Sequence, residues 1–97
     1  MYVRLTYFNI PPEKADDLKT VYYDDVAPVI RQQMGIIDVM LLVPGHSDDE
    51  YISCTIWKND EYIKDFEKSD AYPDVFEKIK AMAVGAPKQK YYQIPQH

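Results

Sequence analysis

The sequence predicts an α+β domain with the element order β-α-β-β-α-β, in which two helices cover one face of an antiparallel sheet. Three observations lead to this ferredoxin-like fold. Four short segments are rich in β-branched and aromatic residues, and proline or glycine interrupts them. Two longer segments carry apolar residues with a helical period. The length of 97 residues allows one domain, residues 1–97.

The first half of the chain reads as strand, helix, strand. Residues 2–9 form the first predicted strand, which Pro11 and Pro12 end. A proline at the first helical position, followed by acidic residues, starts a helix at Pro12. Pro28 lies inside the helical pattern and is expected to kink it in the preceding turn, and Gly35 ends the helix.

The second half begins with a predicted hairpin. Residues 36–43 and 51–57 are its strands, and Pro44 and Gly45 turn the chain between them. The first of these strands is apolar on both faces except for Asp38.

A second helical segment follows the hairpin. Asn59 or Asp60 caps this segment, which restarts in its middle and ends at Gly85 and Pro87. Residues 88–94 are then expected to form the last strand.

Composition excludes several classes of protein. The hydrophobic fraction of 46% is too high for a disordered chain, and no apolar run approaches the ~18 residues of a membrane span. The net charge of −5, without a basic cluster, predicts binding to neither nucleic acid nor an anionic membrane. With no secretory leader and a single cysteine, Cys54, the expected location is the cytoplasm.

One face of the predicted sheet has no helix to cover it. Successive side chains of a strand point to opposite faces of the sheet. In residues 51–57 this alternation places Ile52, Cys54 and Ile56 together on a purely apolar face. Uncovered apolar faces of this size are rare on monomers. The sequence therefore predicts a homodimer through the sheet face. A monomer whose loops fold over the sheet is the alternative.

The opposite face of the same strand mixes aromatic and hydroxyl side chains, as the lining of a small-molecule pocket does. Its residues are Tyr51, Ser53, Thr55 and Trp57. In the alternative interpretation, the two hydroxyls bond neighbouring backbone and the aromatic side chains form a core. The residues predicted to line a pocket for an aromatic or hydrophobic ligand are Tyr7, Asn9, Tyr22, Tyr51, Thr55, Tyr62, Phe66, Tyr72 and Phe76.

Other catalytic patterns are missing from the sequence. It has no glycine-rich phosphate loop, and neither His46 nor His97 has a second histidine nearby, so we expect no metal site. Cys54 follows the pattern of an inert buried thiol. The paired carboxylates of the first helix are expected to face solvent.

Two segments carry a family resemblance. Residues 55–69 end a strand in Trp57 and continue into an acidic-capped helix with a Lys-Ser step, and residues 26–36 contain a kinked helix end before a strand. Both resemble the antibiotic-biosynthesis-monooxygenase-like group of dimeric α/β-barrel proteins. The resemblance implies ferredoxin-like subunits whose sheets pair face to face. It also implies that an oxygenase of this kind needs no cofactor.

The resemblance also suggests site residues. Oxygenases of the group use a tryptophan at the end of the third strand, which Trp57 matches, and an asparagine four residues earlier, where this chain has Ser53. These two are the candidate catalytic residues. The positions of the haem-degrading members' asparagine, second tryptophan and histidine hold Val3, Phe66 and Phe76, so haem degradation by that mechanism is not expected.

Three functions follow from this interpretation. The first is a cofactor-independent monooxygenase of a small phenol or quinol, in which Trp57 packs on the ring while Ser53, Thr55 and a tyrosine hydroxyl bind its oxyanion. The second is a binding or sensing module that uses the same pocket without chemistry. The third is a proton-transfer isomerase or lyase, which needs a carboxylate or histidine in the pocket.

Overall fold

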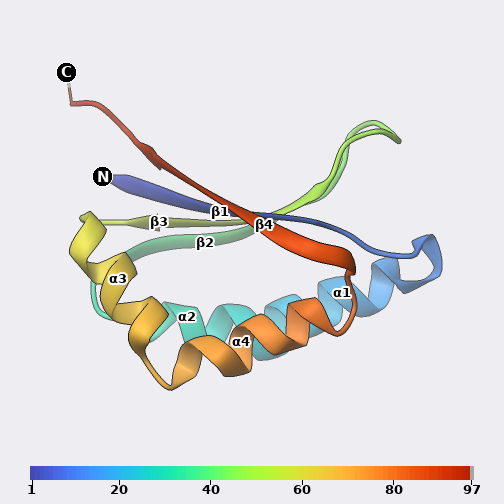
Figure 1. Cartoon of the computed structure of the whole chain (residues 1–97), viewed down its shortest axis with the longest axis horizontal. Helices are drawn as coiled ribbons and strands as arrows, with labels where there is room; N and C mark the ends of the chain where they lie inside the picture. The colour runs from blue at the N-terminus through green and yellow to red at the C-terminus, as the bar shows by residue number, and fades with distance from the viewer. Residues whose placement is uncertain (97) are drawn as a thin grey trace.

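The computed structural model describes residues 1–96 and contains one four-stranded antiparallel sheet in the order β2-β3-β1-β4. The strands are β1 (Tyr2–Asn9), β2 (Ile36–Leu42), β3 (Tyr51–Trp57) and β4 (Val84–Gln93). Figure 1 shows the helices together below one face of this sheet. The predicted ferredoxin-like α+β fold is confirmed.

The first helical region is nearly continuous and contains a π turn. A short 3-10 turn, η1 (Pro12–Lys14), leads into α1 (Ala15–Val21), η2 (Tyr22–Val26) and α2 (Ala27–Arg31). In η2 the N–H of Ala27 bonds the carbonyl of Tyr22, five residues earlier. This wider turn directly precedes Pro28, whose missing N–H disfavours a regular α-helical turn there. The predicted irregularity before this proline is therefore present.

The second helical region consists of α3 (Asp60–Lys68) and α4 (Ala71–Lys80). Asn59, one of the two candidate caps, is the observed cap, because its side chain accepts hydrogen bonds from the backbone N–H groups of Glu61 and Tyr62. The described helices include none that is long and apolar enough to cross a membrane.

The predicted start of the last strand is wrong by four residues. β4 begins at Val84, which pairs with Asn9, so Gly85 and Pro87 lie inside the strand rather than at the helix end. The edge position of β4 explains this, since a proline there can direct its missing N–H away from the sheet.

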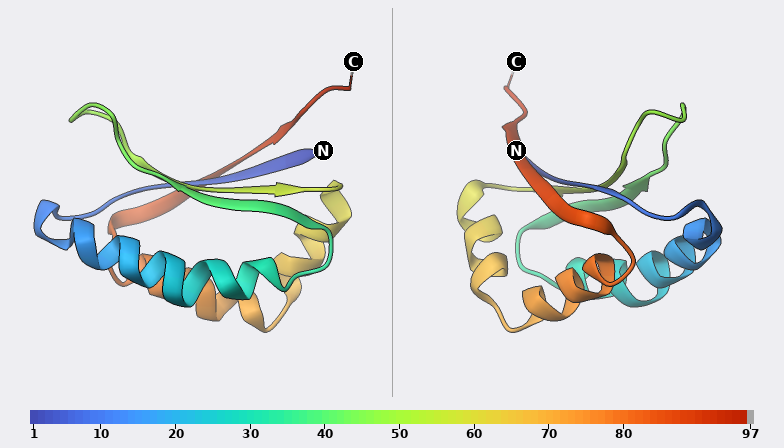
Figure 2. Two further views of the ribbon diagram at one scale, coloured as in Figure 1. Left: turned by 180° about the vertical axis from the view of Figure 1, so that it is seen from behind. Right: turned by 45° about the vertical axis from the view of Figure 1, so that its right-hand side comes forward.

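The core lies between the sheet and the helices. Its most deeply buried side chains are Leu18, Tyr22, Val26, Trp57 and Ile63. In the described part of the chain no helix lies over the other sheet face, and the β2–β3 connection rises on that side at one edge (Figure 2). We call this uncovered face the open face: Val3, Leu5, Tyr7, Asp38, Met40, Leu42, Ile52, Cys54, Ile56, Lys88, Lys90 and Tyr92.

Candidate functional site

Four buried polar side chains gather at the centre of the helix-facing sheet surface. They are Arg4 and Thr6 of β1 and Ser53 and Thr55 of β3, and each is at most 6% exposed. Arg4 pairs with Thr55, and Thr6 pairs with Ser53, in the register of the two central strands. We call these four residues the central polar block. Polar groups at this depth lower stability unless each is hydrogen-bonded, and every buried side-chain nitrogen and oxygen in the described residues has a partner.

The Ser53 side of the block is completed by a tyrosine from the π turn. The phenol oxygen of Tyr22 lies 2.8 Å from Ser53 Oγ, and it donates to the backbone carbonyl of Met40 at 3.2 Å. Burial raises the pKa of Tyr22 from its usual 10.0 to about 12. Tyr22 and Ser53 therefore form a pair of neutral hydroxyls at neutral pH.

The Thr55 side of the block supports Trp57. The indole Nε1 of Trp57 donates to Thr55 Oγ1 at 2.9 Å, and that hydroxyl donates to the carbonyl of Arg4 at 3.3 Å. Trp57 is fully buried and stacks on Phe66, with ring centroids 5.4 Å apart. Phe66 meets Tyr72 edge-on, so a row of aromatic rings runs from β3 to α4.

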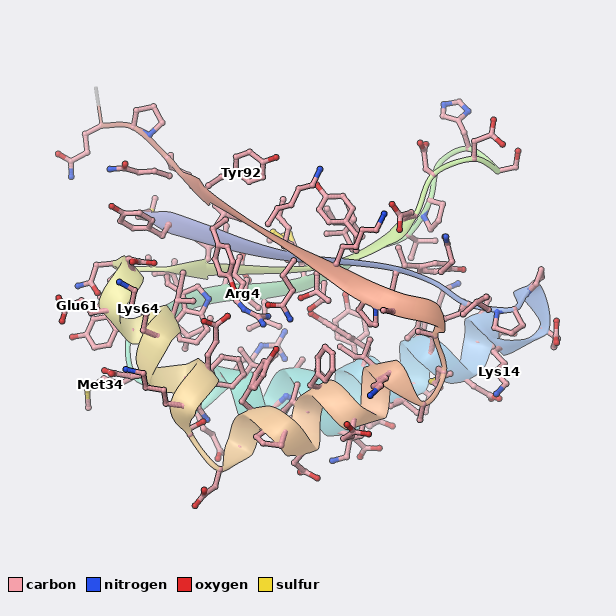
Figure 3. All side chains as sticks on the ribbon, in the orientation of Figure 1. Arg4, Lys14, Met34, Glu61, Lys64 and Tyr92 are labelled. Carbon is pink, nitrogen blue, oxygen red and sulfur yellow. The ribbon has the colours of Figure 1, made fainter. Side chains whose placement is uncertain are left out.

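Arg4 extends from the sheet toward the helices (Figure 3). Its Nε donates to a carboxylate oxygen of Glu67 at 2.8 Å, its Nη1 to Thr6 Oγ1 at 3.2 Å, and its Nη2 to the hydroxyl of Tyr72 at 2.9 Å. The guanidinium also lies 5.1 Å from the centre of the Tyr72 ring. The buried cation is therefore paired and hydrogen-bonded, which its burial requires.

Two side chains of the edge strand β4 close this region from outside. Gln89 donates to the Tyr72 hydroxyl at 2.8 Å, and the Tyr91 hydroxyl donates to the Glu67 carboxylate. Burial and this bond raise the pKa of Tyr91. We call Arg4, Glu67, Tyr72, Gln89 and Tyr91 the Arg4 cluster. Tyr91 is exposed, so solvent reaches the outer side of the cluster at the β4 edge.

The structure brings together most of the predicted pocket residues around the central polar block. Tyr22, Ser53 and Thr55 bond within it or to it, and Trp57 and Phe66 pack beside it. Tyr72 and Phe76 continue the aromatic row, with centroids 5.7 Å apart.

Four predicted pocket residues lie elsewhere. Tyr7 is on the open face, where the Lys90 ammonium lies over its ring, and Asn9 is exposed at the end of β1. The prediction that both lie on the helix side is wrong, because the sequence alone does not show which face of β1 meets the helices. Tyr51 lies on the helix-facing side of β3, as predicted, but at the opposite end of this strand from Trp57, where it stacks on Phe8. Tyr62 packs against Gly35.

Arg4, Thr6 and Glu67 were missed as candidates. Arg4 and Thr6 alternate with Phe8 on one face of β1, and this pattern would have placed them beside the hydroxyls of β3 once the helix-facing side was known. Glu67 lies one position after Phe66 on α3 and has no comparable signal in the sequence.

The two described cavities lie at the β2–β3 connection rather than at Trp57. One, of about 360 Å³, is lined by Tyr7, Leu42, Ile52 and the acidic residues 48–50. The other, of about 420 Å³, is lined by Asn9, Tyr51 and His46 among others. Within residues 1–96 no group of histidine, cysteine and carboxylate side chains is arranged to hold a metal ion.

Residues 1–78 match the family model described as antibiotic biosynthesis monooxygenase. The chain belongs to this family. No curated protein sequence matches the chain.

Solved structures share the fold of this antibiotic biosynthesis monooxygenase family member at low sequence identity. A Deinococcus radiodurans protein with the same family description superposes with a TM-score of 0.82, at 14% identity, over 100% of this chain and 95% of that one. SnoaB, a cofactor-independent oxygenase from Streptomyces nogalater, gives 0.78 at 12% identity over 99% and 94%. MhuD, a heme degrader from Mycobacterium tuberculosis, gives 0.78 at 17% identity over 100% and 98%.

Proposed function

We propose that this chain is a cofactor-independent monooxygenase that binds a small phenol or quinol between the sheet and the helices. The central polar block is the observation that carries the proposal. A core built only for stability would be apolar there, whereas this one places four polar side chains beside Tyr22, Trp57 and Phe66. A flat ring with a hydroxyl needs this combination of aromatic and polar neighbours.

The proposed reaction uses the substrate as the reductant. An electron-rich phenolate or enolate supplies two electrons to O₂ and forms a hydroperoxide on one of its carbons. Loss of water from this hydroperoxide takes two more electrons from the same carbon, which becomes a carbonyl. One oxygen atom therefore stays in the substrate, and the other leaves as water with the two displaced hydrogens. The protein has to orient the ring, stabilise its oxyanion and exclude water. Trp57 and Phe66 suit the first task, and the side chains of the central polar block suit the second.

Family membership supports the proposal, since one solved structure with the same fold is described as a cofactor-independent oxygenase. The residues of this chain do not favour the other described activity, heme degradation. By the family resemblance, Phe66 and Phe76 stand at the positions of the tryptophan and histidine of heme-degrading members.

A binding protein without chemistry is the second candidate. The specific observation that favours it is the engagement of Ser53, whose hydroxyl is already paired with Tyr22 in a closed core. A ligand then has to displace side chains at the β4 edge before it reaches Trp57. Ligand binding without oxygen consumption is the result that would select this candidate.

We also propose that two copies of the chain pair through the open face. Its central residues Leu5, Cys54 and Ile56 are apolar and lie side by side in the register of β1 and β3. A second copy would remove this area from water, a contribution of roughly 25 cal/mol per Å² of apolar surface.

Oxygen uptake tests the proposed activity. The purified protein is supplied with a panel of hydroquinones and anthrones, and an oxygen electrode records consumption above the buffer rate. We expect Trp57→Phe and Ser53→Ala to lower the rate at least tenfold, while Lys64→Gln, at an exposed ion pair on α3, leaves it unchanged. Uptake at the buffer rate for every substrate, or equal rates for all variants, contradicts the proposal.

A further inference from the structure

We infer that Arg4 holds the oxyanion of the ligand, so that this site takes an acidic phenol in its phenolate form. The inference rests on the proposed function for the identity of the ligand, and it adds a residue and a charge state that neither the sequence pattern nor the family description assigns. Arg4 is the only charged member of the central polar block.

The donor groups of Arg4 are only partly used. A guanidinium carries five N–H groups, and the side-chain bonds to Glu67, Thr6 and Tyr72 use one on each nitrogen. Within the described residues this leaves one N–H on each terminal nitrogen. An N–H group of a guanidinium suits an anionic oxygen, because charge-assisted hydrogen bonds are about twice as strong as neutral ones.

The surroundings of Arg4 favour an aromatic anion. The guanidinium lies over the ring of Tyr72, and the row of Tyr72, Phe66 and Trp57 continues from it along the core. A ring that packs in this row would place a hydroxyl at the cation. In this low-dielectric environment a nearby positive charge lowers the pKa of a bound phenol.

Glu67 limits the affinity of this site for a phenolate. Its carboxylate pairs with Arg4 Nε at 2.8 Å and also accepts from Tyr91, so it already offsets part of the cation's charge. The other titratable groups that face Arg4 are the phenols of Tyr72 and Tyr91. Because Glu67 repels a phenolate, removing its charge should strengthen phenolate binding, the reverse of removing Arg4.

Access is expected at the β4 edge. Gln89 and Tyr91 extend from an edge strand, and their side chains link Tyr72 and Glu67 across the outer side of the cluster. Rotation of these two side chains would open Arg4 without moving the sheet or the helices.

A chromophoric phenol tests the inference without any turnover. 4-Nitrophenol is titrated with the protein, and the absorbance of its phenolate gives both the affinity and the pKa of the bound ligand. We expect the wild type to bind the phenolate and to lower the ligand's pKa. We expect Arg4→Gln to weaken phenolate binding at least tenfold, with less than a twofold change for the neutral analogue 4-nitroanisole.

Two further variants control for charge and for folding. Glu67→Gln should tighten phenolate binding, and Lys64→Gln, which removes a positive charge from the exposed surface of α3, should change nothing. If circular dichroism shows that Arg4→Gln is unfolded, Glu67→Gln tests the inference instead. Tighter phenolate binding by this variant supports the inference, and weaker binding contradicts it.

The inference is overturned by no binding of 4-nitrophenol to the wild type, by an unshifted ligand pKa, or by a shift that survives in folded Arg4→Gln. Unchanged or weaker phenolate binding by Glu67→Gln overturns it as well. Failure of the proposed function gives a different result. In that case the ligand pKa is lowered and depends on Arg4, but oxygen uptake stays at the buffer rate. This result supports the anion site and excludes the oxygenase.

Discussion

The phenol oxygen of Tyr22 lies 2.8 Å from Ser53 Oγ, although the two residues belong to a π turn and to a central strand. The wider turn that precedes Pro28 is the segment that carries Tyr22 to this position. The irregular helix and the polar block therefore meet at one hydrogen bond, and this bond lies where the family resemblance expects an asparagine.

Removal of the Tyr22 hydroxyl should lower the stability of the folded protein. In Tyr22→Phe the Ser53 hydroxyl and the Met40 carbonyl both lose a buried partner, and we expect the free energy of unfolding to fall by about 1–3 kcal/mol. Urea denaturation of Tyr22→Phe, Ser53→Ala and the double variant measures the coupling. Additive losses, or an equal loss in Tyr62→Phe, would show that the hydrogen bond contributes nothing.

Stability should fall in strong alkali because of the same tyrosine. The pKa of Tyr22 is about 12 in the folded protein against 10.0 for an ordinary phenol. The folded state therefore holds this proton more tightly, so the stabilisation is complete below about pH 10 and is lost as the pH rises toward 12. The loss is on the order of 2–3 kcal/mol.

Denaturation curves between about pH 9 and 12 measure this loss. The raised pKa of Tyr91 acts in the same direction, so Tyr22→Phe, which retains Tyr91, isolates the Tyr22 contribution. The prediction fails if wild type and Tyr22→Phe lose stability in parallel across this range.

Gly35 and Gly85 form a matched pair for testing the packing of the helix side. Both have positive φ, +83° and +76°, but a Cβ at Gly35 would overlap the ring and Cβ of Tyr62, whereas a Cβ at Gly85 meets nothing within 4 Å. We expect Gly85→Ala to cost about 1–2 kcal/mol for the backbone conformation. Gly35→Ala should cost about 1–3 kcal/mol more for the overlap. Equal losses in thermal unfolding would mean that Tyr62 is not packed on Gly35.

The proposed dimer gives a sharp prediction at the centre of the open face. Leu5→Lys places a second positive charge beside Lys90, its partner in the register of β4, and should convert a dimer into a monomer. Light scattering with size-exclusion chromatography measures the mass at micromolar concentration. Met34→Lys is the control, because Met34 is 78% exposed and lies away from this face (Figure 3). A monomeric wild type, or a dimeric Leu5→Lys, contradicts the prediction.

Local patterns predicted the strands well where side chains alternate. β1 and β3 begin and end at the predicted residues, and α3 is capped by Asn59, one of the two residues that the sequence offers as caps. The start of β4 was missed because Gly85 and Pro87 normally end an element. Only the pairing of Val84 with Asn9 and the edge position of β4 show that a strand tolerates them here.

The candidate site was predictable in part. Trp57, Ser53 and Thr55 share a face of β3 by alternation alone, but the same rule leaves the orientation of β1 open. The sequence therefore predicts Tyr7 beside them, whereas Arg4 and Thr6 occupy that side in the structure. A charged residue in a strand is normally expected to face solvent. Arg4 can be buried because it donates hydrogen bonds to Glu67 and Tyr72, which lie on helices far along the chain.

The emission of Trp57 under anaerobic titration with hydroquinone tests the central claim most directly. Trp57 is the chain's single tryptophan and is fully buried, so its emission reports on the space between sheet and helices. If a phenol or quinol binds beside the central polar block, the emission should change saturably with ligand and stay insensitive to iodide. An emission that hydroquinone leaves unchanged, or quenches without saturation, would contradict the account.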